Sequence, residues 1–426
     1  MTGAVRSIDC TNCGAGLPVL GGGRVVTQVC GYCGASLDAE DSFRVLSVHA
    51  GLTRPDSPFR LGMEGRVDGV PFTVIGTLGQ SESWRGERWN WVDHMIFSPT
   101  HGYAWITVDD GHILLTRKVR DRPAGGFLTS AAVERAETRP TRTWRMLPYR
   151  YYETSTARID FAEGEFTYRP KVGDVATSVA LLPPGGASDM LTYIAGAGPD
   201  GERELEVTRY APELAAAFGA EPPVPEGVHP LQPYRKPAGR RFYAGLFGGS
   251  LALAILGLFV LQGTNGPTRD LYRGEAANLP AGISFEIADP ARPARLTLRQ
   301  PLSNAWADYS VEITDPDGAL LVGTARLIEF YEGRDSDGAW AEGDQDATLD
   351  FQPSVPGTYT LALAADGVDP PMAGRVPLRV TLSEARPNPI WLVGAGAFFL
   401  LAFLWTMSSS FRHRAARWSG SDWSDD

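Results

Sequence analysis

The chain has 426 residues, with 39 Lys or Arg and 50 Asp or Glu side chains, so its formal net charge is −11. This length predicts two or three folded domains. The first 241 residues hold 26 basic and 28 acidic side chains, whereas residues 263–388 hold ten Arg, no Lys and nineteen acidic side chains. Neither part gathers the basic charge that replaces counterions on phosphate, so we expect no nucleic-acid partner.

Four cysteines form two CxxC pairs before residue 34: Cys10 with Cys13, and Cys30 with Cys33. Two such turns, sixteen residues apart, supply four thiolates, the set that closes a tetrahedral zinc site. A glycine after each pair lets the backbone turn beneath the sulfurs, and residues 24–29 between the pairs read as a short strand. We predict a zinc ribbon over residues 1–40 with structural Zn²⁺. A redox CxxC is the alternative, disfavoured because no thioredoxin-like βαβ pattern surrounds two matched pairs.

Residues 41–218 alternate short apolar runs with Gly, Pro and Asp, which predicts a mostly antiparallel cytoplasmic β domain. A polar connection at about 117–145 interrupts the runs, and residues 212–218 read as one short closing helix. We expect the aromatic residues of these runs in the core or on sheet faces, with a ligand-binding aromatic cage as the alternative. These residues are Phe72, Trp91, Phe97, Tyr103, Trp105 and Phe166.

Several motifs of this domain are similar to those of a known family. They are Leu61-Gly62-Met-Glu-Gly65-Arg-Val67, Phe72-Thr-Val74-Ile75-Gly76, Trp91 to Phe97, Gly102-Tyr-Ala-Trp105, Gly164-Glu165-Phe166, Gly173-Asp174 and Leu182-Pro183-Pro184. Together they resemble an uncharacterised bacterial domain-of-unknown-function membrane family. This chain departs from the family pattern at Asp93 and His94, where the family has an acidic residue followed by Tyr.

The resemblance extends to the architecture. Longer members of the family carry an N-terminal zinc ribbon, two transmembrane helices with a β domain between them, and a tail like Arg417-Trp418-x-x-Ser421-Asp422. The resemblance implies no known activity. It implies membrane-associated systems concerned with membrane stress or polyamine-like metabolism.

One stretch of the β domain gathers groups that acid–base or metal chemistry uses. It spans nineteen residues and contains His94, His101, Asp109, Asp110 and His112. On alternating strands some of them could share a face and form a second metal site or an acid–base pair. The other interpretation makes them polar residues of turns and edges, with Asp109-Asp110-Gly111 as a hairpin turn. We favour the second interpretation, because the sequence has no catalytic motif and no enzyme activity is expected.

Residues 219–241 form a Pro-rich basic linker, which we expect to be extended and semi-rigid. Its basic cluster lies before a long apolar run: Arg235, Lys236, Arg240 and Arg241. Such a cluster determines the topology of a membrane span, and recognition of lipid headgroups is the alternative role.

Two apolar runs predict transmembrane helices, over residues 242–262 and 389–410, because about twenty apolar residues cross a ~30 Å hydrocarbon core. Arginines follow the second run in the tail, residues 411–426. Since Lys and Arg accumulate on the cytoplasmic side, we expect a plasma (inner) membrane protein with both termini in the cytoplasm. The alternative is a pair of buried helices in a large soluble protein.

Residues 263–388 would then be translocated. Six or more alternating strands with turn signals between them predict an extracytoplasmic β-sandwich or jelly roll. Within it, residues 332–346 are rich in Asp, Glu and Gly and contain Trp340. We expect a solvated acidic loop, and the alternative is a Ca²⁺ site with Trp340 stacking on a sugar or a cation.

The fold class is therefore mainly β: a zinc ribbon plus cytoplasmic β domain, two transmembrane helices and an extracytoplasmic β-sandwich. The function we expect is a membrane-anchored, non-enzymatic adaptor or scaffold that binds a cytoplasmic protein partner and membrane lipid, with self-association allowed. The alternative is an extracytoplasmic sensor of a cation, polyamine or glycan through the acidic sandwich. A hydrolase that uses His94, His101 and Asp109 ranks last.

Overall fold

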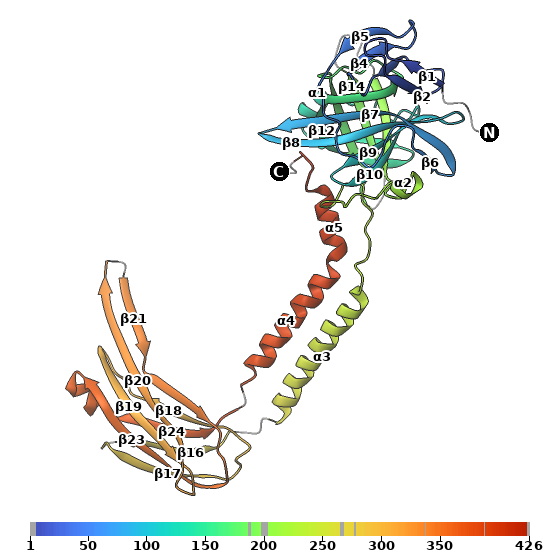
Figure 1. Cartoon of the computed structure of the whole chain (residues 1–426). Coiled ribbons are helices and arrows are strands. Elements are labelled where there is room, and N and C mark those ends of the chain that lie inside the picture. Colours follow the sequence, from blue (N-terminus) through green and yellow to red (C-terminus); the bar gives the residue numbers. More distant parts are fainter. Residues whose placement is uncertain are drawn as a thin grey trace. The chain divides into compact units, whose positions relative to one another are not determined.

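The computed structural model describes residues 6–185, 189–196, 203–264, 268–276, 278–336, 338–386 and 388–423 (Figure 1). The chain forms two compact units. Unit 1 consists of Met1–Ala238 and Ser408–Asp426, and unit 2 of Gly239–Met407. The fold is mainly β, as the sequence predicts.

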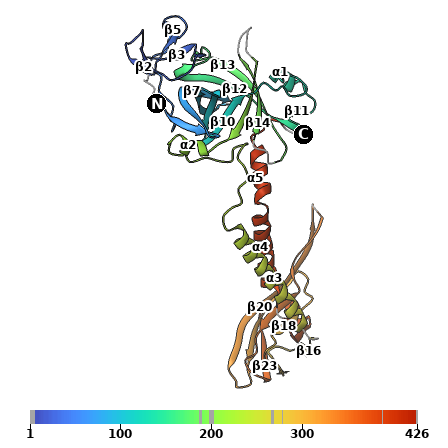
Figure 2. The same ribbon diagram turned by 90° about the vertical axis from the view of Figure 1, so that its right-hand side faces the viewer.

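Long antiparallel strands of unit 1 close into a β-barrel (Figures 1 and 2). They pair in the order β7-β8-β9-β10-β15-β14-β13-β12, and β12 pairs back onto β7. The strands are β7 (Val70–Trp84), β8 (Glu87–Ser98), β9 (Gly102–Asp109), β10 (His112–Lys118), β12 (Leu147–Phe166), β13 (Val175–Leu182), β14 (Asp189–Gly196) and β15 (Arg203–Tyr210). Each half is a meander of four strands consecutive in this sheet, and closure leaves neither half with a free edge in the barrel.

The long strand β12 closes the barrel by changing partners along its length. Residues 150–158 pair with β13, residues 159–164 pair with β7, and the last three pair with β3. Gly164 of β12 lies opposite Gly76 of β7. Gly164 has a φ of +87°, and a Cβ there would stand 2.3 Å from the carbonyl oxygen of Ile75. The crossing therefore requires glycine at this position.

The cysteine region joins the barrel through one continuous sheet. Its strands are β1 (Arg6–Asp9), β2 (Gly16–Val19), β3 (Thr27–Val29), β4 (Ala35–Asp38) and β5 (Arg44–Val48). β3, the core of the strand expected at 24–29, pairs with β12 and β4, and β4 pairs with β5. β5 is thus the last strand at this end of the sheet, and β6 (Glu64–Val67) is the last at the other end.

Both outer faces of the barrel are covered by short elements. The segment 54–63 and α2 (Glu213–Ala217), the expected closing helix, cover the first meander. α1 (Ser130–Glu134) and β11 (Thr141–Trp144) cover the second. The last two elements lie within the connection at 117–145, which is therefore ordered where we expected only a polar link. The reason is that Leu128, Val133 and Trp144 bury their side chains there.

The linker and the C-terminal tail both pack on unit 1. α5 (Ser409–Trp418) runs beside the linker, where the Tyr234 hydroxyl lies 2.7 Å from the Ser409 hydroxyl. Leu231 of the linker and Trp418 of α5 meet inward-facing side chains at one end of the barrel, among them Leu114 and Leu182.

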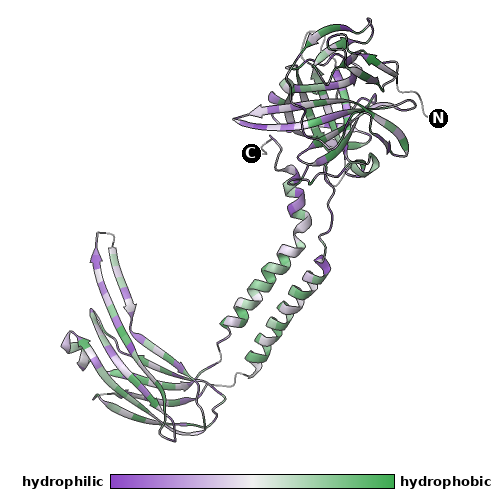
Figure 3. Ribbon diagram, in the orientation of Figure 1, coloured by the Kyte–Doolittle hydropathy of each residue, from purple (hydrophilic) through white to green (hydrophobic). Residues whose placement is uncertain are grey.

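Two helices of unit 2 are long and apolar enough, by length and composition, to cross a membrane (Figure 3). They are α3 (Arg240–Thr264) and α4 (Ile390–Met407). Gly248 of α3 faces Phe403 of α4, and Gly257 faces Leu392, so the helices pack antiparallel.

The rest of unit 2 consists of two antiparallel sheets around one core, as expected for a sandwich. One sheet has the order β16-β24-β18-β22, and the other β17-β23-β19-β20-β21. The strands are β16 (Asp270–Ala276), β17 (Ala281–Ile287), β18 (Ala294–Arg299), β19 (Ala305–Thr314), β20 (Leu320–Asp335), β21 (Gly338–Asp344), β22 (Asp346–Phe351), β23 (Gly357–Asp369) and β24 (Leu378–Glu384), with a short 3₁₀ helix at Pro371–Arg375. Alternate residues such as Tyr309 and Tyr359 fill the core.

The stretch at 332–346 is a β-hairpin and not an irregular loop. β20 and β21 pair from Glu329 with Asp344 to Asp335 with Gly338, and the intervening Asp337 lies outside the described residues. Trp340 lies over Gly333, where a Cβ would stand 2.6 Å from the indole ring. The glycine opposite the indole lets strand pairing continue through this acidic sequence, which the composition alone did not indicate.

Candidate functional site

The four cysteines come together as the sequence predicts. The Sγ atoms of Cys10, Cys13, Cys30 and Cys33 all lie within 4.8 Å of one another. Cys10 Sγ is 3.8 Å from Cys33 Sγ, and Cys13 Sγ is 3.8 Å from Cys30 Sγ. Four thiolates bound to one Zn²⁺ at about 2.3 Å in a tetrahedron stand about 3.8 Å apart, so the residues fit this ion. The same distances are too long for disulfides, and all four thiols are free.

The two CxxC turns have the same backbone geometry. Gly14 and Gly34 donate their N–H groups to the carbonyls of Cys10 and Cys30, and both adopt positive φ, of +75° and +70°. A Cβ on Gly34 would stand 2.0 Å from the carbonyl oxygen of His49. Each turn aims two sulfurs at one point, which is the arrangement of a closed structural site with no open position for a substrate.

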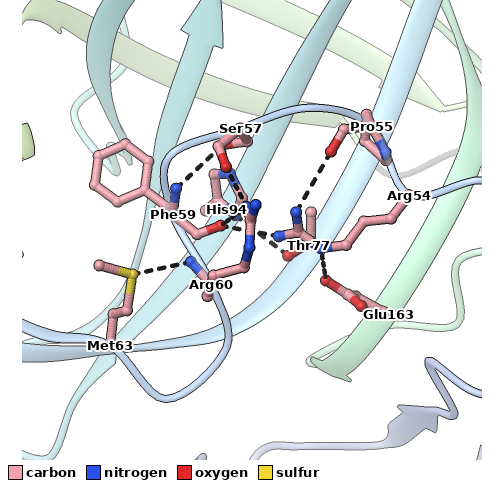
Figure 4. A network of polar contacts seen from close by, with 9 residues as sticks. All are labelled: Arg54, Pro55, Ser57, Phe59, Arg60, Met63, Thr77, His94 and Glu163. Atoms are coloured by element: carbon pink, nitrogen blue, oxygen red, sulfur yellow. Dashed lines mark hydrogen bonds and ion pairs between the residues drawn. The ribbon is translucent and has the colours of Figure 1, made fainter. Parts of the chain in front are cut away.

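His94 is held as part of the packing between the barrel and the segment 54–63 (Figure 4). Its Nε2 lies 2.7 Å from Ser57 Oγ, and its Nδ1 lies 3.2 Å from Thr77 Oγ1. Burial, together with the charges of Arg54 and Arg60, lowers the pKa of His94 to about 3. Both ring nitrogens have partners and the ring stays neutral, so His94 is not available as a ligand or a base in this arrangement.

The other members of the stretch at 94–112 do not converge with His94. His94 is opposite Ile106 on the outward face of the sheet, whereas Asp109 is opposite Trp91 and faces inward. His101 lies exposed in the turn after β8. Asp110 and Gly111 form the hairpin turn that the sequence predicts, both with positive φ. A shared acid–base site of His94, His101 and Asp109 therefore does not form.

The inside of the barrel carries acidic side chains that sequence reasoning missed as a group. Alternation along the strands turns Asp93 of β8, Asp109 of β9, Glu153 of β12 and Glu206 of β15 inward. Trp105 of β9 stacks on Phe166 of β12 at a ring distance of 6.5 Å, which shows that these faces meet inside. The signal was in the strands, where each of these acids lies on the face opposite an apolar one, and where Glu204 and Glu206 of β15 are two residues apart.

Burial shifts the pKa of each of these carboxyls upward. It raises the pKa of Asp93 to about 6 and that of Glu206 to about 7, with Glu204 adding to the latter shift. Burial and the nearby Asp422 raise the pKa of Glu153 to about 8. The charge of Asp93 adds to the upward shift in the pKa of Glu206, although β8 and β15 are not neighbouring strands, and both carboxyls point inward.

The acidic hairpin of unit 2 shows no comparable gathering. Its Glu332 accepts a hydrogen bond from Ser303, and Asp346 pairs with Arg299 at 3.5 Å. Over the described ranges of the chain, the cysteines are the group in which three or more metal-ligand side chains bring their donor atoms together. The Ca²⁺ alternative at 332–346 thus gains no geometric support from the residues described there.

The tail binds the barrel through polar and aromatic contacts. Asp422 accepts hydrogen bonds from the Tyr151 hydroxyl at 2.7 Å and the Thr154 N–H at 3.0 Å. The Ser421 hydroxyl donates to the Tyr152 carbonyl at 2.7 Å. Trp418 meets the Tyr152 ring edge to face at 5.7 Å. The residues that carried the family resemblance in the tail are therefore the ones that hold it on the barrel.

The solved structures with which the chain aligns share little sequence and little overall structure with it. The chain aligns with the insecticidal delta-endotoxin Cry8Ea1 of Bacillus thuringiensis at 7% identity and a TM-score of 0.16, over 74% of this chain and 53% of that one. It spans about half of that toxin's length. It aligns with a structure of infectious bursal disease virus, Gx strain, at 10% identity and a TM-score of 0.12, over 90% and 75% of the two chains.

Among curated proteins none matches the chain. Residues 60–207 match DUF4178, a domain of unknown function. The match begins just before β6 and ends within β15, so it contains the barrel almost in full and leaves out the cysteine turns, α3, α4 and the sandwich. Most of the barrel therefore lies within the part of the chain that is similar to this domain of unknown function.

Proposed function

We propose that the protein is a membrane-anchored, non-enzymatic adaptor. In this proposal α3 and α4 cross the plasma membrane, unit 1 lies in the cytoplasm and the sandwich lies outside. Two observations support it. Basic residues flank the helices on the side of unit 1, and the linker before α3 and the tail after α4 both pack on unit 1. The basic flank before α3 and the basic flank after α4 then lie on the same side of the membrane, as two crossings of the membrane require.

The observation that carries the adaptor role is the free outer strand β5. It pairs with β4 on one side, and no described strand pairs with its other side. Leu46 and Val48 of β5 are 37% and 46% exposed and point to one face, and Tyr32 of the second CxxC turn is 79% exposed. An open edge with apolar side chains binds an extended segment of a partner by adding a strand.

The four cysteines hold Zn²⁺ in this proposal, and the ion supplies a cross-link and no reaction. Its role is to fix the edge. Gly34 follows Cys33 and accepts a hydrogen bond from the His49 N–H, directly after β5. Fixing the second turn therefore fixes the position of β5, none of whose five residues is fully buried.

Site-specific crosslinking in native membranes tests the proposal. A photo-reactive amino acid at position 46 or 48 should capture the same cytoplasmic protein, whereas one at Met146, which is 94% exposed on another part of unit 1, should not. Leu46→Asp should abolish the capture from position 48, because a charged edge disfavours strand addition.

The alternatives give distinct results. Capture of a second copy of the chain from both positions would make β5 the interface of a homo-oligomer and replace the adaptor role. Equal capture from positions 48 and 146, or none from position 48 in a protein that still holds zinc, would overturn the proposal.

A further inference from the structure

Small side chains line part of the inside of the barrel. A barrel of eight strands is just wide enough for its side chains to fill or for one small ligand. Here several inward positions of three neighbouring strands carry small side chains: Ser155 and Ala157 on β12, Ala176, Ser178 and Ala180 on β13, and Thr192 on β14. On β8 and β9, Asp93, Trp91 and Trp105 face inward yet keep part of their surface accessible to solvent.

Glu206 is buried on the inside of the barrel without an ion-pair partner among the described residues. Its side chain is 9% exposed, and it makes no hydrogen bond or ion pair with any residue that the structure describes. The cation opposite it in register, Lys118, pairs instead with Glu204 at 2.5 Å. A carboxylate left unpaired at such a depth is costly, and a bound cation would offset that cost.

Asp93 adds a second carboxylate that is oriented but not neutralised. It accepts hydrogen bonds at 2.5 Å from the amide of Gln80 and from the hydroxyl of Thr107. Both donors are neutral, and no Arg or Lys among the described residues forms an ion pair with Asp93. Asp93 and Glu206 therefore both point into the barrel without forming an ion pair with a described residue.

Aromatic rings lie beside these carboxylates. Trp91 is two residues from Asp93 on the same face of β8. Trp105 lies on the neighbouring strand β9, two residues from Thr107, which is opposite Asp93. Indole faces attract cations, and the attraction grows when water is excluded. Aromatic rings and carboxylates together form the kind of site that binds organic ammonium groups.

A bare metal ion fits this site less well. Metal ligands must place their donor atoms within a few ångströms of one point, and among the described residues only the four cysteines do so. Inward carboxylates on two strands that are not neighbours, with indole rings beside one of them, suit a larger cation whose charge is carried on nitrogen and whose carbon atoms contact the rings.

We propose that the inside of the barrel binds a small alkylammonium ion, held between the carboxylates of Asp93 and Glu206 and the rings of Trp91 and Trp105. The site is distinct from the β5 edge. Partner capture at β5 and ligand binding in the barrel can therefore fail independently.

Titration calorimetry of the full-length protein in detergent tests this site. The probes are n-butylammonium and tetramethylammonium chloride, with butan-1-ol as the neutral control and sodium butyrate as the anionic control. Both ammonium ions should bind and change tryptophan fluorescence, and neither control should. Glu206→Gln should weaken binding at least about tenfold, and Trp105→Leu should weaken it too. Glu213→Gln, on the surface in α2, should bind as the wild type does.

The outcomes decide the proposal. Circular dichroism first confirms that each variant is folded. Absence of binding by both ammonium ions at millimolar concentration overturns the site, and so does equal binding of butan-1-ol, which would show an apolar pocket. Unchanged affinity of a folded Glu206→Gln variant overturns the assignment of Glu206.

Discussion

Buried carboxylates make the stability of the barrel depend on pH. The pKa of Glu206 is about 7 in the fold against a usual 4.5, because burial disfavours the charged form and the neighbouring Glu204 repels it, although Lys118 acts in the opposite direction. The fold thus favours the protonated form. Glu206 costs no stability below pH 4.5, its cost grows between pH 4.5 and about 7, and the cost is fully present above pH 7.

Glu206→Gln should therefore stabilise the protein at pH 8 and leave it unchanged near pH 4. Glutamine keeps the shape of protonated glutamate at every pH, so the expected gain at pH 8 is about 1–3 kcal/mol. Thermal unfolding of both proteins at the two pH values measures it. Glu213→Gln on the surface is the control, and an equal shift at both pH values would contradict the explanation.

The cysteines allow a second test at single positions. Cys30→Ser should lose the bound ion, because three thiolates no longer close the tetrahedron, and the wild type should contain about one zinc per chain. Elemental analysis of purified protein measures the content. Tyr32→Ser changes an exposed residue in the same CxxC turn and should keep its zinc. Loss from both variants would mean that the turn, and not the ligand set, decides binding.

Single residues also show why part of the site could not be predicted. The spacing of the four cysteines specifies the chemistry by itself, and the structure brings their sulfurs together. The closeness of His94 and Asp109 in sequence proved misleading, because the register between β8 and β9 puts the two side chains on opposite faces of the sheet. Asp93 and Glu206 are more than a hundred residues apart, and only the pairing of β10 with β15 brings their strands into one sheet.

Among the elements, β12 decides whether the barrel closes. Alternating patterns predicted the individual strands and the hairpin turn at 109–111. The pairing of β12 with β7 joins residues about eighty positions apart and leaves no local signal. The apolar residues inside the connection at 117–145 indicated an ordered segment, but the polar residues around them made the connection resemble a loop. The charged side chains at 332–346 likewise favoured the prediction of a loop where the chain forms a hairpin.

Gly164→Ala should prevent closure. The new methyl group would clash with the carbonyl of Ile75 and would force a side chain into positive φ. We expect a loss of more than about 3 kcal/mol in the free energy of unfolding, measured by denaturant titration. Gly16→Ala in β2, where a Cβ has no neighbour within 4 Å, is the control and should change stability little. A stable Gly164→Ala protein would mean that β12 does not cross at this glycine.

For the molecule as a whole, the proposed topology predicts that a reagent outside the cell reaches the sandwich of unit 2 but not unit 1. Trp340 in the hairpin is 44% exposed, and Trp84 at the end of β7 is 64% exposed. A membrane-impermeant maleimide added to intact cells should label Trp340→Cys and should label Trp84→Cys only after lysis. The reverse pattern would invert the topology, and protection of both positions until lysis would place the sandwich inside the cell.

The contacts of Asp422 also set an order of events during synthesis. Asp422 and its partner Tyr151 are 271 residues apart. The ribosome therefore releases the strands of the barrel long before the segment that covers one of their ends, and both helices and the sandwich are made in between. A chain whose translation stops early is left with that end bare. Tyr151 and Tyr152, which are buried in the complete chain, would then be exposed, and proteases and chaperones would recognise the unfinished chain by them.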